Sequence, residues 1–270
     1  MHDALKFATH LAIQAGNLLK QYYHPAGLHS SQKADHTLVT EADLAADQMI
    51  TNSIHAHFPA DEIISEESSH QVNDIHSPVW VIDPLDGTTN FSLGLPIWGV
   101  SIARMQDGSP ELGVANFPLI NEIYTARKGK GAALNYRPIT TRAPDPKQPN
   151  SFFACCSRTF RSYTVDIPYK PRILGAAVYS FCMVARGTAL LGFDAAPKIW
   201  DLAAVWLLVE QAGGKITAFE GPPPFPLSPA QDYRTTHYPT LAAATEQLFS
   251  FAGKKIQRKS KFALIVQEKA

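Results

Sequence analysis

The sequence is poor in cysteine, carries no net charge and lacks any long apolar run, and each deficit excludes a class of protein. Three cysteines in 270 residues, two of them adjacent, cannot build a disulfide framework, so we expect free thiols in a reducing compartment. Lysine plus arginine equals aspartate plus glutamate at 24 each, so we expect no overall electrostatic attraction to nucleic acid or to a membrane. No stretch approaches the ~20 apolar residues that a transmembrane helix needs.

What is present indicates a globular protein of the cytoplasm. The first residues, MHDALKFATHLAIQAG, interrupt a short apolar pattern with acid and amide groups, which is not typical of a signal peptide. With 45% hydrophobic residues, the chain can bury a substantial core. We therefore expect a single cytoplasmic domain over residues 1–270.

The apolar pattern of the first half predicts helices beside a meandering sheet. Apolar side chains recur at helical spacing over 3–24, and a second helix is expected over 41–57, with Thr40 as its cap. Short apolar runs predict strands at 79–83, 97–104, 111–117 and 122–126. This half, about 1–145, is therefore expected to be α+β.

Beyond the proline-rich stretch at 138–149, the pattern changes to alternating strands and helices. The expected elements are a strand at 151–156, a helix at 176–186, a strand at 189–193 and a helix at 199–212. Such alternation is typical of a layered α/β half, here about 150–270. The basic tail after Gly253 is expected to form a solvated surface helix, and no partner is assigned to it.

The segment Asp83-Pro-Leu-Asp-Gly-Thr-Thr-Asn90 carries the strongest chemical signal. Its two carboxylates flank a proline turn at the end of an expected strand, so both can point at one place. The following Gly87 and Thr88 are typical of a helix start, whose unpaired amides form a phosphate cradle. The alternative is purely structural: Asp86 makes a turn and Thr88 caps a helix. Because a strand precedes this segment and a helix follows it, we favour the functional interpretation.

Acidic residues elsewhere have simple structural explanations when each is taken alone. Glu66 follows an apolar pair and could be a surface charge at a strand end. Asp201 opens the helix expected at 199–212, where the helix dipole favours an acid. Asp43 stands three residues after Thr40, a spacing that is typical of a capping box.

Together these segments resemble the inositol monophosphatase family, within the magnesium-dependent, lithium-sensitive phosphomonoesterases. The resemblance covers about residues 33–214 and includes two family signatures in the right order, WVIDPLDGTTNF at 80–91 and WD at 200–201 leading into EQAGG at 210–214. Ser65 stands where the family usually has glycine. The resemblance implies a layered α-β-α-β-α sandwich of the inositol monophosphatase and fructose-bisphosphatase type, a phosphoric monoester hydrolase activity and a homodimer.

The resemblance also implies a metal site of two or three Mg²⁺ ions. Its ligands would be the carboxylates of Glu66, Asp83, Asp86 and Asp201 and the main-chain carbonyl of Leu85. Converging acids repel one another by about 4 kcal/mol per pair at ~4 Å in an effective dielectric of about 20, so hard cations must neutralise them. Oxygen ligands favour Mg²⁺ over zinc. His55 and His57 lie two residues apart on an expected helix and face different ways, so we expect no metal there.

Catalytic roles are implied for Thr88 and Asp43. Thr88, hydrogen-bonded to Asp43, would orient and help deprotonate a metal-activated water that attacks phosphorus. The amides of Gly87 and Thr88 would hold the phosphoryl oxygens where charge builds. No covalent phospho-enzyme is expected, because the motifs contain no cysteine or histidine.

Substrate contacts are implied at a further set of positions. These are Asp194, where family members more often have glutamate, and Gly175, Ala176, Ala177 and Lys33. Asp194 could instead be an ordinary loop aspartate after a strand. Arg158 or Lys198 could meet a second anionic group.

Several substrates fit the same chemistry. Inositol monophosphate is preferred, and histidinol phosphate, a sugar bisphosphate or phosphoadenosine phosphate are the alternatives. An alternative of another class is a catalytically silent regulatory protein that binds a phosphate ligand. The presence of every expected carboxylate and of Thr88 counts against that alternative.

Overall fold

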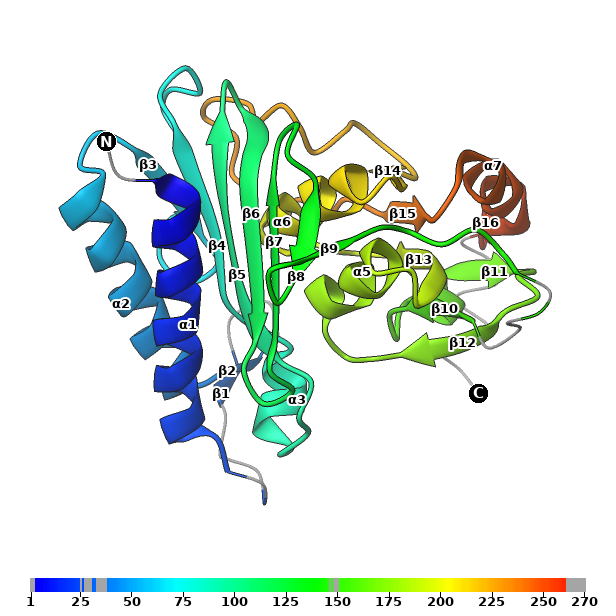
Figure 1. Cartoon of the computed structure of the whole chain (residues 1–270), viewed down its shortest axis with the longest axis horizontal. Helices are drawn as coiled ribbons and strands as arrows, with labels where there is room; N and C mark the ends of the chain where they lie inside the picture. The colour runs from blue at the N-terminus through cyan, green and yellow to red at the C-terminus, as the bar shows by residue number, and fades with distance from the viewer. Residues whose placement is uncertain are drawn as a thin grey trace.

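A seven-stranded sheet, a five-stranded sheet and three layers of helices are stacked in the order helix, sheet, helix, sheet, helix in the computed structural model of the chain (Figure 1). The structure describes residues 3–24, 26, 31–32, 38–145, 147 and 151–260. The expected α-β-α-β-α sandwich is confirmed. The prediction of one domain with two halves stays a prediction.

The larger sheet has seven strands and forms the second layer. Its first two strands run parallel, and each later strand pairs antiparallel with the one before it, as a meander does. The strands, in sheet order, are β3 (Glu62–Ser65), β4 (Val79–Asp86), β5 (Gly99–Gln106), β6 (Ser109–Phe117), β7 (Glu122–Arg127), β8 (Ala132–Leu134) and β9 (Arg137–Ile139). All eight residues of β4 are buried, so this strand lies between layers on both faces.

Two long helices cover the outer face of this sheet (Figure 1). Helix α1 (Ala4–Tyr22) turns an apolar stripe toward β5 and β6, and Asp3 caps its first turn. Helix α2 (Glu41–His57) begins and ends where the sequence predicts. Its start is fixed by a capping box, in which the Thr40 side chain accepts from the Asp43 amide and the Asp43 carboxylate accepts from the Thr40 amide.

The inner helices lie between the two sheets. Helix α6 (Ile199–Gln211) packs across β4 and β6, and α5 (Ala177–Ala185) packs beside it and against β13 (Ala189–Asp194). Both helices are apolar on nearly all sides, which suits a helix with sheets on either side. The predicted helices at 176–186 and 199–212 are therefore confirmed to within one residue at each end.

The smaller sheet and one more helix complete the stack. Its strands, in sheet order, are β12 (Lys170–Ile173), β10 (Phe152–Cys155), β13 (Ala189–Asp194), β15 (Thr240–Ala243) and β14 (Lys215–Ala218). Strand β10 runs parallel to β12 and β13, whereas β15 runs antiparallel to both of its neighbours. Helix α7 (Glu246–Lys255) covers the outer face.

Several short elements connect these layers. They are β1 (Ser31–Gln32), β2 (Leu38–Val39), α3 (Thr88–Ser92), α4 (Thr159–Ser162), β11 (Tyr163–Val165) and β16 (Ile256–Arg258). Helix α3 begins at the predicted place, directly after Gly87.

The prediction of a solvated helix after Gly253 is wrong for the residues that follow Lys255. Helix α7 ends there, and β16 pairs antiparallel with β11. Two of the basic side chains have acidic partners: Lys255 pairs with Asp166, and Arg258 pairs with Glu220. The sequence alone did not reveal these ion pairs, because Asp166 and Glu220 lie far from the tail along the chain. Residues 261–270 lie outside the described part.

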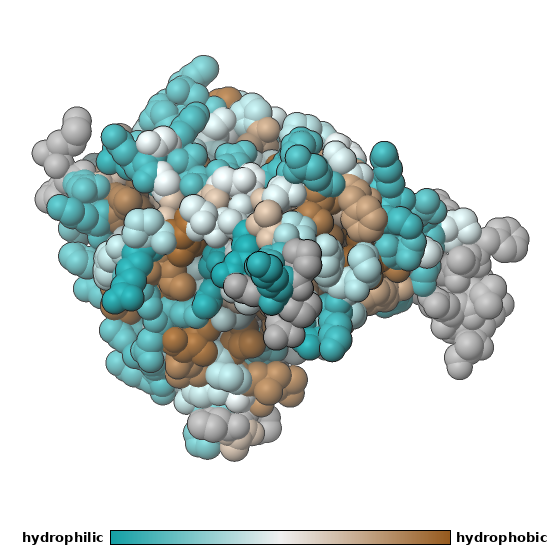
Figure 2. Space-filling model, turned by 45° about the vertical axis from the view of Figure 1, so that its right-hand side comes forward, coloured by the Kyte–Doolittle hydropathy of each residue, from teal (hydrophilic) through white to brown (hydrophobic). Residues whose placement is uncertain are grey.

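The described residues bury three apolar clusters. The largest joins the inner helices to both sheets, the second lies under α1 and α2, and the third lies under α7. On the face that Figure 2 shows, hydrophilic residues predominate and apolar ones occur in separate groups. All three cysteines are free thiols, as predicted. Within the described residues, no helix is both long and apolar enough to cross a membrane.

Candidate functional site

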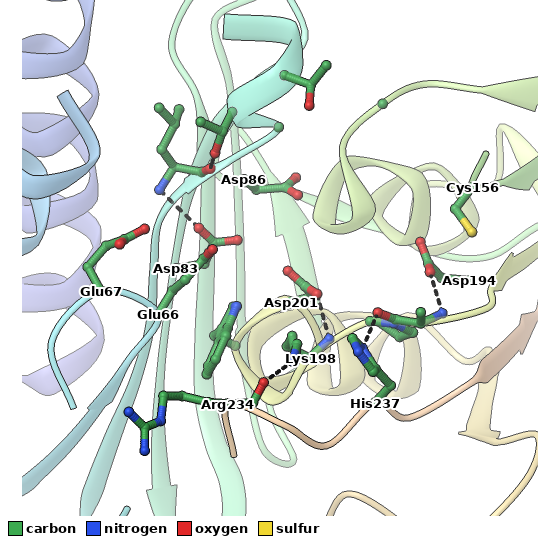
Figure 3. Close-up of a pocket in the computed structure, with 18 of the residues that line it drawn as sticks. Glu66, Glu67, Asp83, Asp86, Cys156, Asp194, Lys198, Asp201, Arg234 and His237 are labelled. Atoms are coloured by element: carbon green, nitrogen blue, oxygen red, sulfur yellow. Dashed lines mark hydrogen bonds between the residues drawn. The ribbon is translucent and has the colours of Figure 1, made fainter. Parts of the chain in front are cut away.

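Three carboxylates meet where the end of β4 faces the start of α6. Asp83 and Asp86 lie at the end of the strand, and Asp201 lies in the first turn of the helix. One carboxylate oxygen from each lies within 4.8 Å of the others. Figure 3 shows these side chains and that of Glu66 pointing into one space. The two sequence motifs are therefore brought together by the packing of α6 across β4.

The pKa values of the three aspartates are raised by burial and by repulsion from neighbouring acids. Burial raises the pKa of Asp83 well above its usual value, and repulsion from Glu66, Asp86 and Asp201 raises it further. The pKa of Asp86 is raised to about 7, chiefly by burial. Burial, Asp86 and Glu66 likewise raise the pKa of Asp201. Because each carboxylate penalises the ionised form of the others, the cluster favours either protons or a cation.

Backbone amides fix the orientation of each carboxylate. Asp83 Oδ1 accepts from the Leu85 amide at 3.0 Å, and Asp201 Oδ2 accepts from the Lys198 amide at 2.6 Å. Asp86 accepts from two amides at the start of α5, those of Ala177 at 2.8 Å and Tyr179 at 3.3 Å. These bonds lower the pKa of Asp86 but do not cancel the effect of its burial.

The chemistry of this donor set suits a hard divalent cation. Three carboxylates from two elements, β4 and α6, converge, and Glu66, which directly follows β3, adds a fourth acid to the same cleft. The Leu85 carbonyl lies nearby and accepts from Thr88 Oγ1 at 3.1 Å. Oxygen-only ligands of this kind fit Mg²⁺, Mn²⁺ or Ca²⁺ better than zinc.

Thr88 and Asp43 are in contact although they are far apart in the chain. Thr88 Oγ1 lies 3.1 Å from Asp43 Oδ1, and the other Asp43 oxygen accepts from the amide and hydroxyl of Thr40. Asp43 thus serves the capping box with one oxygen and meets Thr88 with the other. The two interpretations of Asp43 that the sequence offers are therefore compatible.

The turn between β4 and α3 requires glycine at position 87. Its φ of 88° is left-handed, and an added Cβ would lie 3.0 Å from the Ile97 carbonyl oxygen and 3.2 Å from the Ala176 methyl. Gly87 and Thr88 both line the cleft. The phosphate cradle at their amides stays a prediction.

The cleft above the carboxylates has a volume of about 1130 Å³ and is lined from both sheets. Asp194, at the end of β13, lines it and accepts from the Ala196 amide at 3.0 Å. Burial raises the pKa of Asp194, and the nearby Arg158 opposes this shift. Gly175 also lines the cleft. A concave site of this size can hold a small metabolite.

Two of the predicted substrate contacts, Ala176 and Ala177, are not among the described residues that line the cleft. Ala176 is buried behind Gly87. Ala177 contributes its amide to Asp86 instead. Lys33 lies outside the described residues.

One wall of the cleft was missed by sequence reasoning. The strap, defined here as residues 228–239, carries Arg234, Thr235 and His237 to the rim. Its Tyr233 amide donates to the His70 carbonyl at 3.0 Å, and further along the strap another amide donates to the Pro197 carbonyl at 2.9 Å. The strap therefore ties the segment after Glu66 to the segment before α6. The sequence signal that could have indicated the strap is a pair of tyrosines, Tyr233 and Tyr238, in a proline-rich loop. Both are buried in the structure.

A five-layer sandwich with carboxylates gathered between its sheets defines a class of metal-dependent phosphomonoesterases. The family model of the inositol monophosphatase family matches residues 1–250, and the chain belongs to that family.

Three relatives illustrate the similarity. Nus factor SuhB of Escherichia coli is 37% identical over 232 residues, which cover 82% of this chain and 87% of that protein. A histidinol-phosphatase of Chlorobaculum parvum is 35% identical over 232 residues, covering 82% and 88%. Among solved structures, the IMPase of Thermotoga maritima has a TM-score of 0.76 at 26% identity, covering 94% of this chain and 96% of that one.

Proposed function

We propose that this chain hydrolyses a small phosphate monoester with Mg²⁺ as its cofactor. The observation that carries the proposal is the meeting of Asp83, Asp86 and Asp201, whose mutual repulsion a bound cation would relieve. Glu66 and the Leu85 carbonyl would complete the ligand set for two or three ions. The histidinol-phosphatase among the relatives supports the same reaction class.

Bound Mg²⁺ would supply an activated water and would neutralise charge on the phosphoryl group and on the departing alkoxide. The Thr88 hydroxyl would orient that water, and Asp43 would accept the proton that Thr88 shares with it. The amides of Gly87 and Thr88 would bind phosphoryl oxygens, because the left-handed turn at Gly87 leads directly into α3.

Inositol monophosphate is the substrate that we propose first. Asp194 lies at the cleft wall, where its carboxylate can accept hydrogen bonds from the hydroxyls of a polyol. Arg158 and Lys198 line the same cleft, which supports a sugar bisphosphate or phosphoadenosine phosphate as the second choice. Histidinol phosphate stays an alternative because of the Chlorobaculum relative.

The name of one relative, Nus factor SuhB, raises a function of another class as the alternative. A catalytically silent protein would have no need for the acidic cluster, whose mutual repulsion is costly. We therefore propose the enzyme, as a cytoplasmic and lithium-sensitive homodimer without a nucleic-acid or membrane partner.

The test is phosphate release from inositol 1-phosphate, histidinol phosphate, fructose bisphosphate and phosphoadenosine phosphate. We expect turnover of at least one substrate with Mg²⁺ and none with excess chelator. Turnover that chelator leaves unchanged would refute the metal mechanism. Tight binding of these ligands without turnover under any divalent cation would favour the silent binder.

A further inference from the structure

Asp47 is a buried carboxylate on α2 to which the proposed mechanism gives no role. It is 6% exposed and lies one helical turn after Asp43. Ser65, which is fully buried, donates its hydroxyl hydrogen bond to Asp47 Oδ1. Among the described residues, Ser65 is the side-chain donor that reaches this carboxylate. Ser65 directly precedes Glu66 in the chain.

The two aspartates lie on the same face of α2 and reach two different parts of the site. Asp43 contacts Thr88 after β4, and Asp47 contacts Ser65 at the end of β3. Residues four apart on a helix are neighbours, so their side chains keep a fixed relative position. One rigid helix thus sets the spacing between the proposed water-orienting threonine and the segment that carries Glu66.

The backbone around Ser65 is fixed from several directions. Its amide donates to the Ser69 carbonyl at 2.6 Å, and the Glu66 amide donates to the Ile82 carbonyl at 3.2 Å. These bonds hold the main chain, and the Ser65 hydroxyl adds a side-chain link from the end of β3 to α2. The hydrogen bond to a buried carboxylate is charge-assisted, and such bonds are among the stronger ones in proteins.

We propose that Asp47 and Ser65 are positioning residues that direct the Glu66 carboxylate toward Asp83 for metal binding. The inference rests on the proposed function, because it assumes that Glu66 holds a metal ion. Without the Ser65 hydroxyl, the end of β3 loses its link to α2, and Glu66 samples orientations that miss the ion. Second-layer hydrogen bonds of this kind change metal affinity by about 10- to 100-fold in other metal sites.

The test is calorimetric titration of the full chain with Mg²⁺ or Mn²⁺. Ser65→Ala is expected to weaken binding of one class of ion by about 10-fold or more, while the ion held by Asp86 and Asp201 keeps its affinity. Phosphate release should then need more metal for half-maximal rate, with kcat nearly restored at saturating metal. The control is Ser53→Ala, because Ser53 lies on α2 and its hydroxyl donates within that helix to the Met49 carbonyl at 2.8 Å, away from the site.

A double-mutant cycle separates positioning from a general loss of stability. In a Glu66→Gln background, Ser65→Ala is expected to cause no further loss of metal affinity, because the ligand that it positions is already impaired. An equal loss in both backgrounds, or no loss in the wild-type background, would overturn the inference. If Ser65→Ala does not fold, Asp47→Asn is measured in the same two backgrounds, with the same pattern expected and the same contrary results decisive.

The outcomes also distinguish this inference from the proposed function. A wild-type chain that binds no divalent ion would refute the proposed function itself. If the wild type binds divalent ions and Ser65→Ala binds them with the same affinity, the positioning role alone is refuted.

Discussion

Asp83→Asn is expected to stabilise the metal-free protein while removing its activity. Asparagine keeps the shape of the side chain and an oxygen that can still accept the Leu85 amide, which lies 3.0 Å from Asp83 Oδ1. What the substitution removes is a negative charge that burial and three neighbouring acids already disfavour. A proposed Mg²⁺ ligand is thereby replaced by a group that costs less to bury.

The magnitude follows from the spacing of the carboxylates. Their oxygens lie within 4.8 Å of one another. At that separation two unit charges repel by about 3.5 kcal/mol in an effective dielectric of about 20. Raised pKa values leave part of the cluster protonated at neutral pH, so we expect a net gain of about 1–3 kcal/mol. For a chain of this size that corresponds to a rise of roughly 2–10 °C in Tm.

The assay is thermal unfolding with chelator and with saturating Mg²⁺. In chelator Asp83→Asn should melt above the wild type, and with Mg²⁺ the order should reverse, because the wild type gains more from the ion. Phosphate release should fall at least ~100-fold. The control is Asp166→Asn, an exposed aspartate paired with Lys255, which should change Tm little and equally in both conditions. A variant that melts below the wild type in chelator would refute the reasoning.

Three further perturbations give distinct results. The pKa of Asp86 is about 7 in the folded protein and 3.8 for a free side chain, so the folded protein binds more protons than the unfolded chain between these two pH values. The Tm of the metal-free protein should therefore fall as pH rises from about 4 to 7. Bound Mg²⁺ should abolish this trend. Thr88→Val should lower kcat by about 100-fold or more with little change in metal affinity, because it removes the hydroxyl that contacts Asp43. Thr88→Ser keeps a hydroxyl and should retain most activity. Equal activity of the two variants would contradict the role of the hydroxyl. Gly87→Ala should lower the free energy of unfolding more than Gly129→Ala does, as measured by chemical unfolding. Both glycines have positive φ, but only at position 87 would the added Cβ lie 3.0 Å from the Ile97 carbonyl oxygen. Equal losses of stability would show that this contact is harmless.

Much of the fold could be predicted from the sequence because the relevant forces are local. Helix α2 begins and ends as predicted, since Thr40 and Asp43 close a capping box within one turn. The turn after β4 was also predictable, because Gly87 and the residues around it specify a strand, a left-handed residue and a helix in immediate succession. Strands with weak apolar patterns, such as β12 and β16, were not predicted, because their formation depends on neighbours far along the chain.

The sequence by itself determined which residues carry acidic, oxygen-donor chemistry and on which elements they lie. Only the tertiary structure decided that Asp201 meets Asp83 and Asp86, since that approach depends on α6 packing across β4. It also decided that the strap forms one wall of the cleft and that Asp47 reaches Ser65. Caps and turns form within a few residues, whereas burial and close approach of charges are consequences of how whole layers stack.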